Sequence, residues 1–458
     1  MNIAVIGAGW AGLSAAVRLK DLGAAVTVFE AAPLPGGRAR GVADVNMGTI
    51  DNGQHLMLGA YTESLKLIKR LLPERPLDQV LLRTPLHLES ADGSFKLQAS
   101  TLPAPLNTLL ALLSAKGLGL SERLRALRMM LQCRLTGWRA QPNETVQSLL
   151  LRHQQSALLC HRLWTPLCLA ALNTPISQSC AQLFLNVLRD SLDGRRDASD
   201  LLIPSVDLTE LWPAAAAQIV TMRYRHIVRK VRARPTHVDI DQERFDACIV
   251  AVPPYAASRI LFESGGVEIT DEGPSAEPDD HSMRLPQAQS EAALHRILQA
   301  FEYRAIATLT LELESDWLLP QPMLMLDENL TRGHVGQWVF KRAAHARQLS
   351  IVISDASDFL KQDREPFVQA VASQIREQCA KHPLCTSEMP AVKYQRLIVE
   401  KRATFDAIPG LARPDNKSPW PRIALAGDWT DTGYPAVLEG AIRSGLGAAN
   451  LLRQELSL

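Results

Sequence analysis

Residues 2–40 read NIAVIGAGWAGLSAAVRLKDLGAAVTVFEAAPLPGGRAR, and the rest of the chain is best interpreted from them. A short apolar run precedes the triplet Gly7-x-Gly9-x-x-Gly12. Apolar residues at helical spacing follow, and a second apolar run ends in Glu30. This order predicts a strand, a glycine turn, a helix and a second strand, which together form a dinucleotide-binding βαβ unit.

Each residue type in this unit has a physical role. Gly7 permits the tight turn, Gly9 lets the backbone approach a diphosphate, and Gly12 lets the helix lie close to the sheet. The start of the helix offers N–H groups and the positive end of its dipole to phosphates. Glu30 lies 18 residues after Gly12, where its carboxylate can accept hydrogen bonds from both hydroxyls of a ribose. An unphosphorylated ribose, as in FAD or NAD, is therefore expected, with these ligands: Gly7, Gly9, Ala11, Gly12 and Glu30.

The segment Gly36-Gly37-Arg38 follows the acid and favours FAD. Small residues let the loop close on the diphosphate, and Arg38 offers it a planar cationic group. Gly37 and Arg38 are therefore predicted cofactor ligands. Two alternatives stay open, namely Arg38 as an ordinary surface charge and the whole motif as the glycine-rich turn of an ordinary α/β domain.

The composition is that of a globular protein. The chain has 458 residues, 47% of them apolar and 21% charged, and its formal net charge is +1. The length favours two domains. The balanced charge, without a basic stretch interleaved with aromatic residues, predicts no nucleic-acid partner.

The cysteines and the apolar runs indicate the compartment. Seven cysteines without C-x-x-C spacing predict buried thiols in a reducing compartment, with no metal site. The first strand starts at residue 3, which leaves no room for a signal peptide, and no apolar run is long enough to span a bilayer. We therefore expect a cytoplasmic protein, with peripheral contact at the inner face of the cytoplasmic membrane left open.

A turn-rich segment, residues 51–61, reads DNGQHLMLGAY. Its turn residues place Gly53, Gln54 and His55 on a tight backbone path soon after the phosphate loop, so this segment can reach a flavin ring. We expect Gly53 and Gln54 to bind the cofactor and His55 to lie near the reacting atoms. The competing interpretation of His55 is a structural histidine bonded to the backbone.

The middle of the chain predicts further sheet and helix. Residues 86–89 and 95–97 flank a turn and predict a β-hairpin. Residues 103–135 are leucine-rich with interspersed basic residues, which fits either an apolar helical lid that touches lipid or a pair of ordinary core helices, the interpretation that base rates favour. Helical patterns continue at residues 164–173 and 181–192.

Strands return in the second half. Residues 227–231 and 245–254 predict a partly exposed hairpin that leads to a buried parallel strand, so the cofactor domain is expected to be discontinuous in sequence. Residues 265–286 are acidic, contain Pro and Ser, and predict a flexible loop. The remaining predictions are strands at residues 305–313, 337–340, 350–354 and 391–399 and a helix at residues 367–379.

The chain ends on a second informative stretch, residues 422–445, which reads RIALAGDWTDTGYPAVLEGAIRSG. A buried strand is predicted to deliver Gly427 and Asp428 to a turn, and a helix is expected to begin near Pro435. Small residues on one helix face would admit a flat ring or another backbone. The helix start, aimed at a flavin, would stabilise the negative charge of its reduced ring. The predicted cofactor ligands in this stretch are Gly427, Asp428, Ala436 and Ala441. The competing interpretation is a terminal helix that only packs on the sheet.

Residues 7–30, 36–38 and 427–445 together resemble the flavin-dependent amine oxidase and phytoene desaturase superfamily. Within it, residues 51–61 and 426–436 are most similar to the squalene-associated branch, the hydroxysqualene dehydroxylases of bacterial hopanoid synthesis. The resemblance implies an FAD enzyme that reduces hydroxysqualene to squalene. It also implies a long isoprenoid substrate and contacts with squalene and hopanoid pathway enzymes.

The same resemblance implies a glutathione-reductase-like α/β fold. A Rossmann FAD-binding domain would be joined to a substrate domain of mixed sheet plus helices. Backbone at Val228 would contact the adenine. We assign residues 1–62, 204–256 and 400–458 to the FAD-binding domain and residues 63–203 and 257–399 to the substrate domain with its helical lid.

Reduction of an allylic alcohol needs a proton for the departing oxygen and a long apolar tunnel for the rest of the lipid. The candidates for the general acid are His55, Asp431 and Tyr434. The leucine-rich helices and the second sheet are the expected tunnel walls.

Rival functions share this architecture. A carotenoid desaturase or isomerase acts on a similar lipid. An amine oxidase usually needs an aromatic cage and often a covalent flavin cysteine, and no Cys lies near Gly427 or Tyr434 in the sequence. The prenyl-binding GDP dissociation inhibitors, a non-enzymatic class, lack the intact flavin motifs that this chain keeps.

Overall fold

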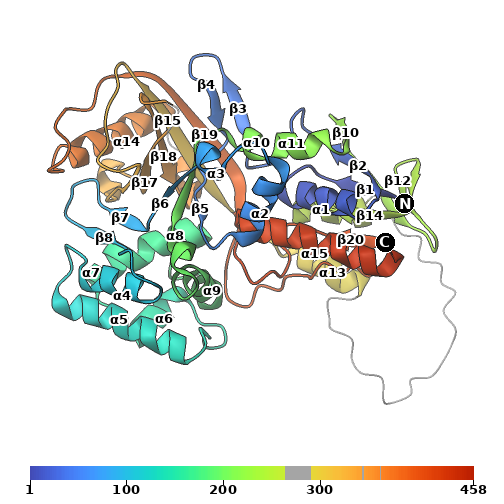
Figure 1. The fold of residues 1–458 in the computed structure, drawn as a ribbon, viewed down its shortest axis with the longest axis horizontal. Helices are drawn as coiled ribbons and strands as arrows, with labels where there is room; N and C mark the ends of the chain where they lie inside the picture. The colour runs from blue at the N-terminus through green and yellow to red at the C-terminus, as the bar shows by residue number, and fades with distance from the viewer. Residues whose placement is uncertain (264–289, 343–344, 362, 458) are drawn as a thin grey trace. The chain divides into compact units, whose positions relative to one another are not determined.

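The computed structural model describes residues 1–263, 290–342, 345–361 and 363–457, which form two compact units (Figure 1). The first unit comprises Met1–Gly37, Trp212–Glu302 and Ala412–Leu458, and the second comprises Arg38–Leu211 and Tyr303–Leu411. The predicted domains are an FAD-binding domain and a substrate domain, whereas the two units are defined by compactness alone. The predicted domain boundaries therefore stay a prediction. The loop predicted at residues 265–286 lies outside the described residues.

The first unit is built on a five-stranded parallel sheet in which both chain ends take part. The predicted strands at residues 3–6 and 25–29 are confirmed, and the one predicted at residues 245–254 is shorter, covering residues 247–250. The buried strands read as apolar runs because both of their faces are covered. The strand at the β10 edge has the mixed sequence Thr-Met-Arg-Tyr and was not predicted. The sheet order is β10 (Thr221–Tyr224), β2 (Ala25–Glu30), β1 (Asn2–Ile6), β14 (Ala247–Val250) and β20 (Ile423–Leu425).

Two helices of the first unit, one from each end of the chain, pack directly against one another (Figure 1). These are α1 (Trp10–Asp21) and α15 (Leu438–Leu456). The approach is so close that a Cβ on Gly445 would lie 2.1 Å from the carbonyl oxygen of Ala11. Gly445 of α15 therefore faces the backbone of α1 directly.

The last helix begins later than predicted. It starts at Leu438, because residues 435–437 form a turn in which the Val437 N–H donates to the Pro435 carbonyl at 2.8 Å. The expected start near Pro435 is therefore wrong by part of a turn. The shorter helices of this unit are α11 (Pro213–Gln218), α12 (Pro254–Ser258), a π-helical turn η3 (Arg259–Glu263) and α13 (Glu291–Gln299).

A three-stranded antiparallel sheet follows β10 in the first unit. The strand predicted at residues 227–231 is mostly wrong, because the Arg229 and Lys230 N–H groups both donate to the side chain of Asp241 and not to a neighbouring strand. The observed strands are β11 (Val231–Ala233), β12 (Val238–Ile240) and β13 (Glu243–Phe245).

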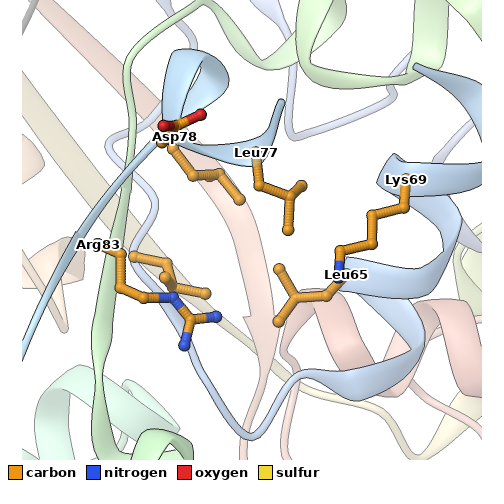
Figure 2. Close-up of a pocket in the computed structure, with 7 residues that line it drawn as sticks. Leu65, Lys69, Leu77, Asp78 and Arg83 are labelled. Carbon is orange, nitrogen blue, oxygen red and sulfur yellow. The ribbon is translucent and has the colours of Figure 1, made fainter. Parts of the chain in front are cut away.

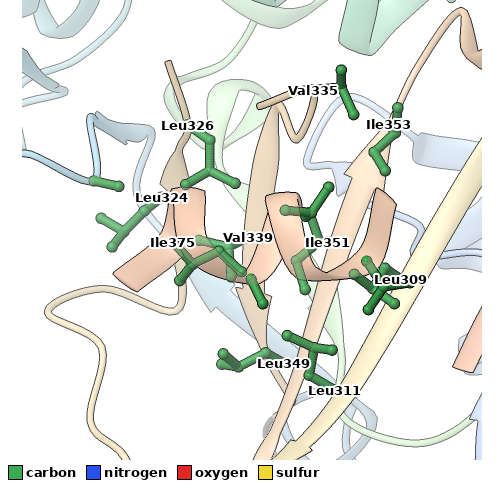
Figure 3. Close-up of a cluster of buried hydrophobic side chains, with 14 of the residues drawn as sticks. Leu309, Leu311, Leu324, Leu326, Val335, Val339, Leu349, Ile351, Ile353 and Ile375 are labelled. Atoms are coloured by element: carbon green, nitrogen blue, oxygen red, sulfur yellow. The ribbon is translucent and has the colours of Figure 1, made fainter. Parts of the chain in front are cut away.

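The second unit contains a five-stranded antiparallel sheet with a helix on one face. Apolar side chains from the sheet, among them Leu309, Val339 and Ile351, pack against Ile375 of the helix (Figure 3). All the strands and the helix predicted between residues 305 and 399 are confirmed with shifted ends. The predicted elements are β17 (Trp338–Lys341), β18 (Gln348–Ile353), β15 (Tyr303–Leu313), β19 (Val392–Phe405) and α14 (Arg364–Cys379). The remaining strand of the sheet, β16 (Met323–Met325), was not predicted.

Smaller strand groups complete the second unit. The predicted hairpin is confirmed as β7 (His87–Glu89) and β8 (Lys96–Gln98), and the Ala91 N–H in its turn donates to the Met325 carbonyl of the large sheet. The other strands are β3 (Gly41–Asp44), β4 (Gly48–Asp51), β5 (Met57–Leu58), β6 (Leu81–Thr84) and β9 (Leu201–Pro204).

The helices predicted in the second unit are also present. The leucine-rich residues 103–135 form α4 (Leu106–Leu113) and α5 (Leu120–Leu135). Among the described residues, no helix has both the length and the apolar composition needed to cross a bilayer. The remaining helices are α2 (Thr62–Leu71), α3 (Leu77–Val80), α6 (Val146–Arg152), α7 (Ala157–Leu159), η1 (Cys160–Trp164), α8 (Thr165–Leu172), α9 (Ala181–Leu192), η2 (Arg196–Ser199), α10 (Leu208–Leu211), η5 (Leu330–Arg332) and η6 (Ala356–Lys361).

Candidate functional site

The carboxyl ends of the parallel strands gather the two motifs at one edge of the first unit. Strand β1 leads into Gly7, β2 ends in Glu30, and β20 leads into Gly427. Because β2, β1, β14 and β20 are consecutive parallel neighbours, these three ends point the same way. Ligands of open parallel sheets bind at this edge.

The glycine turn after β1 has the geometry that its sequence predicts. Gly7 has a φ of +104°, and its N–H donates to the Phe29 carbonyl at 2.8 Å. A Cβ on Gly12 would lie 1.9 Å from the Gly7 carbonyl oxygen, whereas a Cβ on Gly9 would meet no protein atom within 4 Å. Gly7 and Gly12 are therefore required by the fold, and Gly9 faces open space.

A second loop closes beside this turn. The Gly36 N–H donates to the Ala8 carbonyl at 2.8 Å, and a Cβ on Gly37 would lie 3.0 Å from the Cα of Gly9. Helix α1 starts at this point with Gly9 as its N-cap, a residue that has no side chain to cap the helix. The loop and the first turn of α1 together form a cradle of backbone N–H groups, which suits a diphosphate.

Glu30 is held beside the glycine turn. Its two carboxylate oxygens accept the Ala8 N–H at 2.7 Å and the Ala32 N–H at 2.8 Å. A carboxylate has about four acceptor positions, so each oxygen keeps one for a ribose hydroxyl. The His226 N–H donates to the Glu30 carbonyl at 2.9 Å, which brings the segment containing the buried Val228 to the same strand end.

The turn after β20 is fixed by side chains of α15. The Gly427 N–H donates to the Ser444 hydroxyl at 2.9 Å, and the Thr430 and Ser444 hydroxyls lie 2.6 Å apart. Asp428, the next residue, is buried. These bonds hold the turn at the carboxyl edge of the sheet.

Arg413 organises the same turn and was missed by the sequence analysis. Its guanidinium donates to the carbonyls of Tyr434 at 2.7 Å and Asp428 at 3.1 Å, and also to those of Trp429 and Thr430. No sequence signal marks this residue, because its partners are backbone carbonyls, which every residue type carries. Asn416 acts in a similar way, donating to the Leu425 and Ser444 carbonyls.

The other predicted residues of this stretch lie in or after the same turn. Ala436 lies just before α15 and Ala441 in its first turn, both partly exposed. The side chain of Asp431 is exposed, and the Tyr434 ring lies under the Arg443 guanidinium at 5.2 Å.

The first turn of α15 already holds a carboxylate. Glu439 is fully buried and pairs with Arg443 at 2.8 Å. The positive end of this helix dipole is thus partly neutralised by the protein itself.

Four predicted residues belong to the second unit, namely Arg38, Gly53, Gln54 and His55. The Arg38 guanidinium donates to the carbonyls of Arg402 and Ala403 in β19. The Gln54 amide donates to the His55 carbonyl at 3.2 Å, and Gly53 lies close to the His55 ring.

The hydrogen bond of His55 defines its tautomer. Nδ1 lies 2.7 Å from the Gly53 carbonyl oxygen, which can only accept, so Nδ1 carries the proton and Nε2 of the neutral ring is an acceptor. Burial, assisted by the nearby charge of Arg38, lowers the pKa of His55, while the bond to Gly53 raises it. The neutral ring therefore predominates at neutral pH. The backbone-bonded state that the sequence allowed is observed, and it leaves Nε2 available.

Asp51, at the end of β4, is a second perturbed group in the same segment. Burial raises its pKa to about 6, against the opposing hydrogen bond from the Leu208 N–H and the charge of Arg342. A carboxyl that titrates near neutrality is common at functional sites, although buried structural groups also behave in this way.

The described part of the second unit also contains a cavity of about 350 Å³ (Figure 2). Leu65 of α2 and Leu77 of α3 point toward one another across it, and Lys69 and Arg83 are the basic groups at its wall. The predicted site residues are not among its lining side chains, so the cavity does not correspond to the site expected from the sequence.

The donor set of the first unit fits a dinucleotide with a diphosphate and an unmodified ribose. The open face at Gly9 and the glycine N-cap of α1 match a diphosphate, and Glu30 has acceptor capacity left for hydroxyl groups.

Comparison with known proteins agrees with this fit. The model of the family described as flavin containing amine oxidoreductase matches residues 10–453. The hydroxysqualene dehydroxylase of Rhodopseudomonas palustris is 29% identical over 98% of both chains. A zeta-carotene desaturase of Zea mays is 37% identical over only 16% of this chain and 12% of its own. In fold, the chain is similar to the cyclohexylamine oxidase of Brevibacterium oxydans, with a TM-score of 0.68, 18% identity, and coverage of 100% of this chain and 99% of that one.

Proposed function

The chain belongs to the family of flavin-containing amine oxidoreductases, and from this premise we propose that it reduces hydroxysqualene to squalene with FAD as its cofactor. Family membership makes the protein a flavin-dependent oxidoreductase. This sets aside the rival of a non-enzymatic isoprenoid-binding protein. The identity of the lipid, the FAD form of the flavin and the roles of individual residues are part of the proposal.

The proposed cofactor contacts follow the geometry of the first unit. Gly7, Gly9 and Gly37 present backbone to the diphosphate, and the N–H groups at the start of α1 neutralise its charge. Glu30 accepts from the ribose, with Val228 beside the adenine. Gly427 and Asp428, held by Arg413 and Ser444, lie at the same sheet edge for the flavin end.

The proposed reaction is a two-electron reduction at carbon. The C–O bond of the allylic alcohol breaks, a C–H bond forms, and the oxygen leaves as water after taking up a proton. When bound, FAD supplies the redox chemistry, since its reduced ring delivers two electrons and a proton to the substrate carbon. The protein must bind the lipid away from water, orient its hydroxyl and provide the second proton.

The three proposed proton donors differ in what the structure gives them. His55 presents a neutral Nε2 that can accept from the substrate hydroxyl, and its lowered pKa makes its protonated form scarce but strongly acidic. Tyr434 is fixed through its backbone carbonyl by Arg413. Asp431 is exposed in the first unit.

One observation carries the choice of lipid. The similarity to a hydroxysqualene dehydroxylase spans 98% of both chains, including the regions that would bind substrate. The match to a carotene desaturase covers 16% of the chain and therefore bears on a much smaller part of it. A carotenoid desaturase or isomerase is accordingly the second candidate.

The direction of electron flow distinguishes the candidates. Purified enzyme is photoreduced without oxygen, mixed with hydroxysqualene, and followed at the flavin absorption band. We expect the flavin to reoxidise as squalene forms. Oxidised enzyme mixed with phytoene or cyclohexylamine should keep its flavin spectrum, because neither compound would act as an electron donor.

Two results would contradict the proposal. One is a flavin that stays reduced with hydroxysqualene, and the other is an oxidised flavin that is bleached by a carotenoid or an amine.

A further inference from the structure

Helix α4 exposes a row of leucines. Leu106, Leu110 and Leu113 lie at i, i+4 and i+7 along the helix and are 52%, 40% and 40% exposed. The buried residues of the helix are the polar Asn107 and Thr108 together with Ala111 and Leu112. A surface helix normally has polar residues on its exposed face, so the exposed leucines of α4 are not explained by packing within this unit.

Helix α5 continues the pattern with two apolar faces. One face is buried and contains Met129, Met130 and Cys133. The other is a stripe of leucines that are 52–77% exposed and spaced by four or seven residues, as one helix face requires. This stripe consists of Leu120, Leu124, Leu131 and Leu135.

A side chain of α5 holds the turn between the two helices. The Arg123 guanidinium donates to the Leu113 carbonyl at 2.8 Å and to the Leu118 carbonyl at 3.0 Å. It thereby ties the end of α4 to the first turn of α5, and the two helices pack against one another (Figure 1). We call this surface the leucine face, defined by Leu106, Leu110, Leu113, Leu120, Leu124, Leu131 and Leu135.

Basic residues surround the leucine face. Residues 101–143 contain six basic residues and one acidic residue, Glu122, for a net charge of +5, whereas the whole chain has only +1. On the helical wheel of α5, Arg125 and Arg128 flank the leucine stripe on one side, and both are exposed. The six basic residues are Lys116, Arg123, Arg125, Arg128, Arg134 and Arg139.

We propose that the leucine face docks onto a lipid bilayer that contains anionic headgroups. Single exposed leucines are ordinary on protein surfaces, but seven on two helices that pack against one another are an accumulation of apolar surface that indicates an interaction site. A helix that inserts leucines below the headgroups while arginines contact the phosphates has this composition. A second copy of the chain is a poorer occupant, because a symmetric pairing would bring like charges together.

This inference does not depend on which lipid the enzyme reduces. It rests only on the exposure and charge of one surface in the second unit. The test of membrane docking is therefore independent of the test of the proposed reaction.

Vesicle flotation of the full-length, flavin-loaded protein tests the inference. One set of vesicles contains phosphatidylcholine alone and the other adds phosphatidylglycerol. We expect the protein to float with the anionic vesicles and to bind neutral ones at least about tenfold more weakly. The double variant Leu124→Glu/Leu131→Glu should lower partitioning at least about tenfold, because it removes inserted apolar surface and adds negative charge.

Matched variants separate docking from folding. Leu330→Glu/Leu384→Glu changes two leucines of the same unit that are 66% and 61% exposed but lie outside the leucine face, and it should float as the unchanged protein does. Arg125→Glu/Arg128→Glu should lose binding to anionic vesicles about tenfold or more while keeping the flavin spectrum and melting temperature.

Three results would overturn the inference. They are failure of the unchanged protein to float with anionic vesicles, equal flotation of the Leu124→Glu/Leu131→Glu variant, and a dimer in gel filtration that this variant dissociates while vesicles bind neither protein. The last result would assign the leucine face to contact between copies of the chain.

Discussion

A Cβ built on Gly9 meets no other protein atom within 4 Å, although the residue lies between two tightly packed glycines. Its φ of −74° and ψ of 178° are open to any residue type. The fold itself therefore does not require glycine here, and we propose that glycine is needed so that the protein backbone can approach the cofactor diphosphate.

Gly9→Ala tests that distinction. We expect the cofactor-free protein to unfold at the same denaturant concentration or to gain up to about 1 kcal/mol, since alanine restricts the unfolded chain. Flavin affinity should fall at least about tenfold, which corresponds to about 1.4 kcal/mol. Fluorescence titration of the cofactor-free protein measures the affinity. Normal flavin binding by the variant would contradict the assigned role.

The pKa of Asp51 predicts how stability depends on pH. Burial raises this pKa from 3.8 to about 6, so the folded protein binds a proton more tightly than the unfolded chain between these values. The stability from the protonated carboxyl is present below pH 3.8 and is lost as the pH rises through about 6. Asp51→Asn cannot ionise and keeps an oxygen acceptor for the Leu208 N–H.

The difference in unfolding free energy between Asp51→Asn and the unchanged protein should therefore be about 1–3 kcal/mol more in favour of the variant at pH 8 than at pH 4. Urea unfolding at both pH values measures this difference. Asp78→Asn, which removes an exposed carboxylate, is the matched control. If the two proteins differ in unfolding free energy by the same amount at pH 4 and at pH 8, Asp51 is not held in its protonated form.

At the scale of elements, the contact between α1 and α15 joins the two ends of the chain. A Cβ on Gly445 would lie 2.1 Å from the Ala11 carbonyl oxygen and 2.2 Å from the Ser14 hydroxyl, and both atoms belong to a buried helix. The Ala11 carbonyl is backbone and cannot move without shifting that helix.

Gly445→Ala should accordingly lower the unfolding free energy by about 1–3 kcal/mol, because the two helices are forced apart. Flavin should also be lost more readily, since the glycine turn precedes α1. Gly194→Ala, whose Cβ would have its nearest neighbour at 3.3 Å, is a milder control. Equal melting temperatures for Gly445→Ala and the unchanged protein would refute the close packing.

Long apolar runs and glycine spacing predicted the elements, but not their ends or their edges. Strands β1, β2 and β14 were predicted because buried parallel strands carry continuous apolar sequence. Helix α1 was predicted from the helical spacing of the apolar residues that follow the glycine triplet. Edge strand β10 was missed because its sequence is mixed. Residues 227–230 follow a strand-like pattern, yet the Asp241 side chain binds their backbone N–H groups.

At the scale of the whole molecule, the sequence predicted that both chain ends contribute to one cofactor fold. The parallel sheet confirms that β1 and β20 lie in one sheet, separated by β14. Arg413 could not be predicted, because it binds four carbonyls that carry no sequence signature. The tautomer of His55 likewise depends on a bond to its own neighbouring backbone, which only a structure defines.

The enzyme's central reaction can be followed by the mass of its product. In the proposed reduction, the new hydrogen on carbon comes from a position of the reduced flavin that exchanges with solvent. Enzyme that is photoreduced in D₂O without oxygen and given unlabelled hydroxysqualene should form squalene carrying one deuterium, in an amount equal to the flavin reoxidised. Absence of squalene, or squalene without deuterium, would contradict the account.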